Sequence, residues 1–110
     1  VPHGIANGIL LAACMEFNLE TCPEAYAMVA EAFGVREKGM DDMDAAKAAI
    51  DAVKAFTKTI GHPQRLSEMK VTEDDIVKAA DLSLGDGAIV NNPRVVLDAD
   101  EVLEIYKKVL

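Results

Sequence analysis

Apolar residues recur along this chain at the three- and four-residue spacing of amphipathic helices, and no stretch shows convincing period-two alternation. Capping residues before these segments, and glycine or proline after them, divide the chain into helices. We therefore expect an all-α fold of about five helices. The predicted helices run from His3 to about Asn18, from the Thr21–Glu24 capping box to Gly34, from just after Asp41 and Asp42 to Gly61, from Thr72 to Gly85, and from Asp98 to near the last residue.

The first predicted helix carries no charge from Gly4 to Met15, which is typical of a helix buried at the centre of a core. The run up to Cys14 also has the small residues that precede the lipidated cysteine of a secretory signal. No lysine or arginine precedes Arg36, however, and the apolar stretch Ile9–Met15 is too short to span a bilayer. We therefore expect a central buried helix rather than a targeting segment.

Three further features follow from the same pattern. A short helical turn is predicted at 66–69, and the glycines, asparagines and proline of 85–94 predict a loop. The third helix is expected to present one apolar face, made of Ala49, Ile50, Val53, Phe56 and Ile60.

Composition and charge narrow the function. A length of 110 residues is typical of one domain, and 51% hydrophobic residues exclude intrinsic disorder. The net charge of −8 comes from 19 acidic and 11 basic residues, and the basic residues form no run along the chain. This argues against nucleic acid and anionic membrane surfaces as partners. Cys14 and Cys22 lack metal-site spacing, so reduced, cytoplasmic thiols are expected.

Few residues offer chemistry by position alone. His3 begins the first helix, where the helix dipole opposes protonation of its imidazole. A neutral imidazole suits a metal ligand, but a lone histidine there is more often a surface or capping residue, and both interpretations stay open. His62 follows a helix end and is predicted to be a solvated loop residue. The acidic groups at 41–44 and 73–75 lack calcium-loop spacing and are interpreted as helix caps.

No nucleophile elbow, Walker loop or dinucleotide fingerprint occurs in the sequence. The pair Gly85 and Gly87 follows no strand and directly precedes no helix, so it is not a phosphate-binding loop. On spacing alone, the chain is an acidic helical domain without a complete active site. A non-enzymatic helical interaction module is therefore one hypothesis for its function.

A series of short sequence pieces carries a more specific signal. They are P-H-G-I-A-N at 2–7, I-L-L at 9–11, M-E-F-N at 15–18, G-H-P at 61–63, L-S-E at 66–68, Val71 with the acids at 73–75, N-P-R at 92–94, and Glu101 before a short last helix. In this order they resemble the C-terminal helical domain of the iron-containing (group III) alcohol dehydrogenases, which has a dehydroquinate synthase-like fold. The resemblance covers nearly all 110 residues.

The resemblance implies that residues 1–110 are the C-terminal, metal- and substrate-side domain of a longer enzyme whose nucleotide-binding domain precedes it. In that family one aspartate and three histidines bind the metal, and His3 matches the last histidine. The implied reaction is hydride transfer between NAD(P) and a small alcohol or aldehyde, with Fe²⁺ or Zn²⁺ as Lewis acid. The implied parent is a cytoplasmic homo-oligomer. The chain alone is expected to hold neither metal nor NAD(P) and to be inactive.

The sequence departs from the family at a few positions. Ala88 stands where other members often carry a cysteine, so Ala88 and Ile89 are the predicted substrate-pocket residues, with substrate preference left open. Lys70 replaces a common glycine, and His62 replaces an aliphatic residue; both are interpreted as local turn and surface changes. A face that packs against the missing domain should expose apolar side chains, so self-association of the isolated chain is expected.

Overall fold

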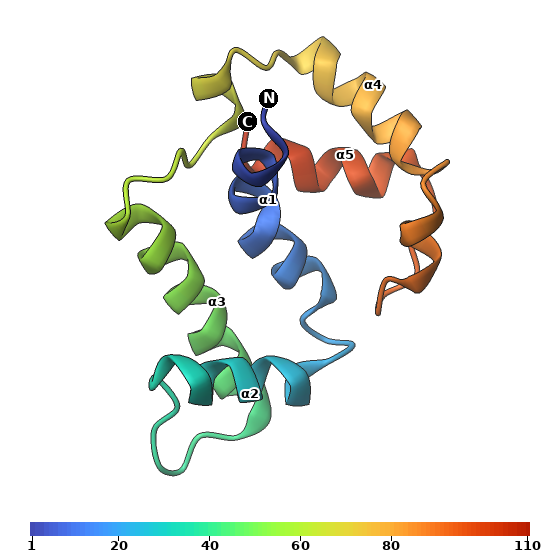
Figure 1. The fold of residues 1–110 in the computed structure, drawn as a ribbon. Coiled ribbons are helices and arrows are strands. Elements are labelled where there is room, and N and C mark those ends of the chain that lie inside the picture. The colour runs from blue at the N-terminus through green and yellow to red at the C-terminus, as the bar shows by residue number, and fades with distance from the viewer.

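The computed structural model describes all 110 residues, and every regular element in it is helical (Figure 1). This confirms the predicted all-α class and the five predicted helices. None of these helices combines the length and the apolar character needed to cross a membrane. The elements are α1 (His3–Asn18), α2 (Pro23–Phe33), α3 (Asp42–Thr59), the 3₁₀ helix η1 (Leu66–Met69), α4 (Glu73–Ser83), the 3₁₀ helix η2 (Gly87–Asn91) and α5 (Ala99–Lys108).

The helix starts confirm most of the predicted caps. The side chains of Asp41, Thr72 and Asp98 each accept a hydrogen bond from the backbone N–H three residues on. The capping box predicted at Thr21 is wrong, because α2 begins one residue later. Its N-cap is Cys22, which offers no side-chain cap, and the Cys22 thiol donates instead to the carbonyl of Asn18 at 3.5 Å.

The segment predicted as a loop at 85–94 contains η2, so that prediction is wrong for residues 87–91. The Asp86 carboxylate accepts from the Ala88 N–H at 2.8 Å and begins the turn. The Asn92 N–H then donates to the Ile89 carbonyl and ends it. Glycine and asparagine do not prevent a single 3₁₀ turn when a side chain caps it.

The first helix lies at the centre of the ribbon, with α3 on one side and α5 crossing it (Figure 1). It buries Ile9, Ala13, Met15 and Asn18, but Leu11 remains 48% exposed. The central position is confirmed, whereas burial on every side is not found in this chain. The uncharged face of α1 that carries Leu11 is covered by no other element.

The core consists of three small clusters rather than one. Alanines join α2 to α3, and their lack of bulk lets the two backbones approach closely; these are Ala27, Ala30, Ala45 and Ala49. A second cluster joins α1, η1 and α4 through Ile9, Leu66 and Ile76, and a third joins α1 to α3 through Met15, Ile50 and Val53. The buried part of the predicted α3 face stops at Val53.

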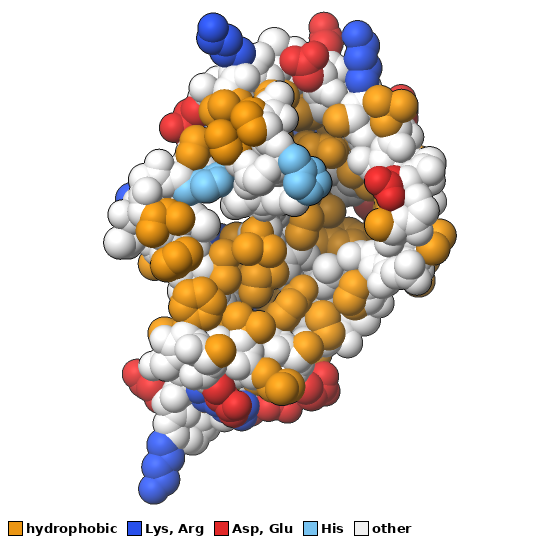
Figure 2. Space-filling model, in the orientation of Figure 1, with side chains coloured by type: hydrophobic (Ala, Val, Ile, Leu, Met, Phe, Trp, Pro, Cys, Tyr) orange, Lys and Arg blue, Asp and Glu red, His pale blue; other side chains and the backbone are white.

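The remaining two residues of that face, Phe56 and Ile60, are 53% and 59% exposed, so the predicted apolar face extends beyond the buried core. Phe56 instead packs its ring against Phe33, with ring centroids 6.2 Å apart, at the margin of an open apolar groove. Figure 2 shows apolar side chains gathered across the middle of this face of the molecule. This apolar groove, of about 570 Å³, is lined mainly by Leu11, Cys14, Met15, Tyr26, Val29, Phe33, Val53 and Phe56.

Candidate functional site

His3 lies at the first turn of α1, and its side chain is exposed. The Asn7 amide nitrogen, one helical turn on, lies 2.9 Å from the imidazole Nε2. This contact engages Nε2 and orients the ring, and which of the two groups donates is set by the ring tautomer. The pair therefore presents an oriented imidazole at the helix start, and Nδ1 makes no hydrogen bond.

Nδ1 fits one ligand position of a metal site in the tautomer whose proton is on Nε2, where Nε2–H donates to the Asn7 amide oxygen. No three histidine, cysteine, aspartate or glutamate side chains of this chain come close enough to hold a metal ion together. A catalytic metal commonly needs three protein ligands. His3 can therefore serve as one ligand, and residues 1–110 do not form a complete metal centre.

The predicted pocket residues Ala88 and Ile89 line an open cavity of about 300 Å³ between η2, the C-terminal half of α1 and α5. From α1 it is lined by Cys14, Phe17 and Asn18. His3 is not among its lining residues. Ala88 and Ile89 thus lie together, and His3 lies apart from them, at the other end of α1.

The wall that carries Ala88 is fixed to α1 by side chains of the M-E-F-N and N-P-R segments. The Asn18 and Asn92 amides exchange two hydrogen bonds, of 3.1 and 2.7 Å, across 74 residues of sequence. The Arg94 guanidinium lies 4.1 Å above the ring of Phe17 and donates to the Phe17 carbonyl. The N-P-R segment and the E-F-N segment therefore contact each other, which explains why both recur in the resemblance.

Cys14 is the reactive side chain nearest to this wall, and it lines both this cavity and the apolar groove. It forms no disulfide, and burial raises the pKa of its thiol. Burial and a hydrogen bond with Cys22 likewise raise the pKa of Tyr26. A protonated thiol is a weak nucleophile, so burial lowers the reactivity of Cys14.

His62 is not the solvated loop residue that was predicted. Its ring packs directly against Gly8 on α1, its Nδ1 donates to the Pro63 carbonyl at 2.8 Å, and its side chain is half-buried. A side chain on residue 8 would collide with the ring, so glycine is needed there. No local sequence pattern indicates this contact, because the two residues are 54 positions apart.

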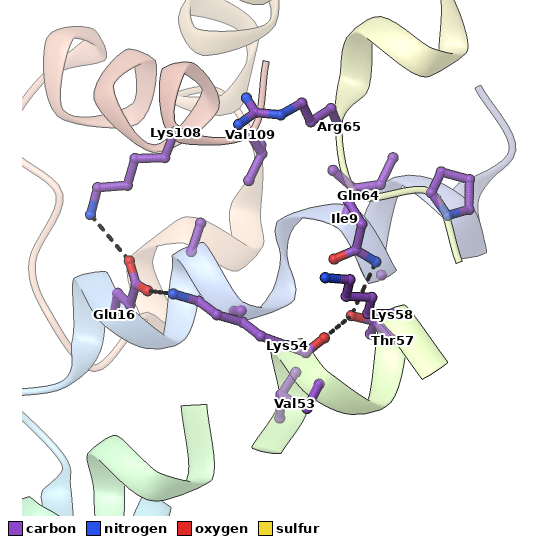
Figure 3. A pocket seen from close by; sticks show the side chains of 15 residues that line it. Ile9, Glu16, Val53, Lys54, Thr57, Lys58, Gln64, Arg65, Lys108 and Val109 are labelled. Atoms are coloured by element: carbon purple, nitrogen blue, oxygen red, sulfur yellow. Dashed lines mark hydrogen bonds and ion pairs between the residues drawn. The ribbon is translucent and has the colours of Figure 1, made fainter. Parts of the chain in front are cut away.

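The basic residues gather in space although they form no run in sequence. Lys54, Lys58, Arg65 and Lys108 all line one cavity of about 400 Å³, in which Glu16 is the only acidic residue (Figure 3). The absence of a basic run in the sequence therefore does not mean that the folded chain has no basic cluster. Helix α3, the segment before η1 and the end of α5 bring these four side chains together.

Glu16 joins three helices at the edge of this cavity. It forms ion pairs with Lys54 of α3 and with Lys108 of α5, the latter at 3.5 Å. Burial opposes ionisation of Glu16, but the hydrogen bonds and charges of the two lysines outweigh it, so its pKa is lowered. The carboxylate therefore stays charged and holds α1, α3 and α5 together.

Comparison with known proteins identifies the class to which this fold belongs. The family model for the C-terminal part of the Fe-containing alcohol dehydrogenases matches residues 1–110. The chain is 38% identical over 108 residues to 1,3-propanediol dehydrogenase of Citrobacter freundii, covering 98% of this chain and 28% of that protein. It is 35% identical over 105 residues to lactaldehyde reductase of Escherichia coli (strain K12), covering 96% of this chain and 27% of that one.

A crystal structure of 1,3-propanediol oxidoreductase superimposes on the whole of this chain with a TM-score of 0.94 at 35% identity. The match covers 28% of that protein's chain. The chain therefore belongs to the iron-containing alcohol dehydrogenase family, and it corresponds to that family's C-terminal part. It spans little more than a quarter of the relatives that it matches.

Proposed function

We propose that residues 1–110 form the C-terminal helical domain of a longer, metal-dependent NAD(P)-linked alcohol dehydrogenase or aldehyde reductase. The observation that carries this proposal is the family match over the entire chain, together with His3 and Asn7 at the start of α1. The relatives include a propanediol dehydrogenase, a lactaldehyde reductase and an NAD-dependent methanol dehydrogenase. A small alcohol or aldehyde is the substrate class that they share by name.

In this proposal His3 supplies one ligand to the metal, and the remaining ligands come from segments outside residues 1–110. A bound Fe²⁺ or Zn²⁺ would supply a Lewis acid for the substrate oxygen. Asn7 keeps the His3 ring oriented through Nε2, which leaves Nδ1 for the metal. The η2 wall, which is the side of the cavity of about 300 Å³ formed by Ala88 and Ile89, borders the substrate in this proposal. The small side chain of Ala88 leaves room for the substrate there.

The proposal also covers the ligands of the isolated chain and the partners and location of the longer enzyme. The isolated chain should bind neither metal nor NAD(P), because it provides one metal ligand and no nucleotide-binding element. The longer enzyme is proposed to be a cytoplasmic homo-oligomer. Neither nucleic acid nor membrane is proposed as its partner.

The test uses the longer protein that contains this chain, with metal content and NAD(P) reduction by a panel of small alcohols measured in parallel. His3→Ala should lower bound metal to background and abolish alcohol-dependent reduction. Asn7→Ala should retain metal less tightly, because the His3 ring loses its orienting partner; loss of a hydrogen bond to a metal ligand commonly costs about 10- to 100-fold in metal affinity. His62→Ala is the matched control and should keep its metal.

Unchanged metal content and activity in His3→Ala would contradict the ligand assignment. NAD(P) reduction by residues 1–110 alone would contradict the requirement for further segments. These two outcomes are independent, so each part of the proposal can fail separately.

A further inference from the structure

The cavity between α1 and α3 gathers basic side chains on an acidic molecule. Four of the eleven basic side chains line it, but only one of the nineteen acidic ones does. Figure 3 shows Lys54 and Lys58 entering from α3, Arg65 from the segment before η1, and Lys108 from the end of α5. Charges of one sign gathered in a concave site raise the local concentration of anions.

The four basic side chains are not equally available. Glu16 pairs with Lys54 and Lys108 and partly neutralises both. Neither Lys58 nor Arg65 forms an ion pair, although the Arg65 charge contributes to lowering the pKa of Glu68. The Glu68 carboxylate, the acid nearest to Arg65 in sequence, instead accepts from the backbone N–H groups of Gln64 and Arg65, at 2.8 Å each. One ammonium and one guanidinium group therefore remain free to bind an anion.

The floor of the cavity is apolar. Ile9, Ala12 and Ala13 come from α1, and Val53 and Val109 come from α3 and the chain end. A bare ion would leave this floor uncovered, whereas an organic body would displace water from it. The volume of about 400 Å³ lies within the usual range for small-molecule sites, about 300 to 1,000 Å³.

We propose that this cavity binds a small phosphate monoester, with the phosphate on Lys58 and Arg65 and the organic body on the apolar floor. The planar guanidinium of Arg65 can donate to two phosphate oxygens at once. The ammonium of Lys58 adds a compact positive charge on a flexible side chain. The site is separate from His3 and from the η2 wall, since neither His3 nor Ala88 lines it. The proposal therefore does not depend on the dehydrogenase activity.

The test is isothermal titration calorimetry on the 110-residue chain with three probes: phenyl phosphate, inorganic phosphate and phenol. Phenyl phosphate should bind, inorganic phosphate should bind more weakly, and phenol should give no measurable heat. Binding of phenyl phosphate should weaken as NaCl is raised, because the contacts are ionic. If phenol bound with the same affinity as phenyl phosphate, the phosphate group would contribute nothing to binding and the proposal would be overturned.

The variant Lys58→Gln/Arg65→Gln should weaken phenyl phosphate binding by at least about tenfold, since two charge-assisted contacts are lost. Lys47→Gln is the matched control: Lys47 is an exposed lysine on α3 that does not line the cavity, and its loss should leave the affinity unchanged. Far-ultraviolet circular dichroism verifies that all variants keep their helices.

Equal affinity in the double variant, or no binding of phenyl phosphate to the wild-type chain, would overturn the proposal. The titration is then repeated on the longer protein. Retained binding there supports a working site, whereas loss of binding would show the cavity to be covered and would overturn it as a site of the intact protein. Failure of this site would leave the metal and activity measurements on His3 unaffected.

Discussion

Gly8 and His62 form a contact in which the missing side chain of one residue makes room for the ring of the other. A methyl group on Gly8 would lie 2.5 Å from the ring carbon Cε1 of His62. The ring cannot simply swing away without losing its hydrogen bond to the Pro63 carbonyl. Glycine inside a helix ordinarily costs stability, so its presence in α1 is explained by this close approach.

This contact predicts that the effect of Gly8→Ala on the melting temperature changes sign when His62 is replaced by alanine. Gly8→Ala should lower the melting temperature of the wild-type chain, because the ring must be displaced. In the His62→Ala background the same substitution should raise it, since alanine is favoured over glycine in a helix by about 0.5 to 1 kcal/mol. Thermal unfolding followed by circular dichroism measures both effects. A stabilising Gly8→Ala in the wild-type chain would contradict the packing of His62.

Lys70 is the one non-glycine residue with a positive φ, 64°, and it ends η1. A side chain in this left-handed conformation costs about 1 to 2 kcal/mol, which glycine avoids. Lys70→Gly should therefore stabilise the chain by up to about 1 kcal/mol after the added flexibility of the unfolded state is allowed for. Lys47→Gly, within α3, should instead destabilise it by about 1 kcal/mol. A destabilising Lys70→Gly would argue against strain at this turn.

Helices α1, α3 and α5 share a single carboxylate, Glu16, at their junction. Its lowered pKa means that the ion pairs stabilise the folded chain above the ordinary glutamate pKa, about 4.3. This contribution is lost as the pH falls through the lower pKa of the folded state. Because the lysines are half exposed, it amounts to no more than about 1 kcal/mol.

Glu16→Gln should accordingly melt below the wild-type chain at pH 7, and the two should converge when the pH falls below about 4. High salt should also reduce the difference at pH 7. Glu104→Gln, which removes only the exposed pair with Lys107, should change stability little at any pH. A Glu16→Gln deficit that stayed constant from neutral to acid pH would rule out the ion pairs as its cause.

At the scale of elements, the helices could be predicted because their signals are local. Apolar spacing and the capping side chains of Asp41, Thr72 and Asp98 mark the helices within a few residues of sequence. The errors at the Thr21 capping box and at residues 87–91 are local, whereas those about His62 and the basic residues concern contacts between distant segments. Phe56 continues the apolar spacing of α3, yet it is half exposed and its ring contacts Phe33 at the margin of the groove. Sequence spacing identifies an apolar face but not what packs on it.

In the candidate site, too, residues marked by a local pattern could be predicted and contacts between distant residues could not. His3 could be singled out because it lies in a specific segment at a helix start. The amide pair of Asn18 with Asn92 could not be, because its partners are 74 residues apart and either asparagine alone fits a surface turn. The cationic cavity was missed for the same reason, since its basic residues come from positions 54, 58, 65 and 108.

As a whole, the molecule is a thin slab with more surface than a compact protein of its mass. Its extents are 45 × 32 × 18 Å, and its accessible surface is 6969 Å². A monomeric protein of 11.8 kDa is expected to expose about 5,900 Å². Part of this surface is the apolar groove, which is lined by the exposed side chains of Leu11, Phe33 and Phe56. Such a face is typical of a surface that packs against further protein.

The isolated chain should therefore self-associate through the apolar groove. Sedimentation velocity should show a concentration-dependent increase in mass, and Phe56→Gln should shift the chain toward monomer. Since Phe56 is half exposed and its main ring contact is Phe33, the variant should remain folded. Leu82→Gln is the control, because Leu82 is an equally apolar, exposed residue of α4 that does not line the groove. A wild-type chain that stays monomeric at high concentration, or Leu82→Gln acting as strongly as Phe56→Gln, would show that the groove does not drive association.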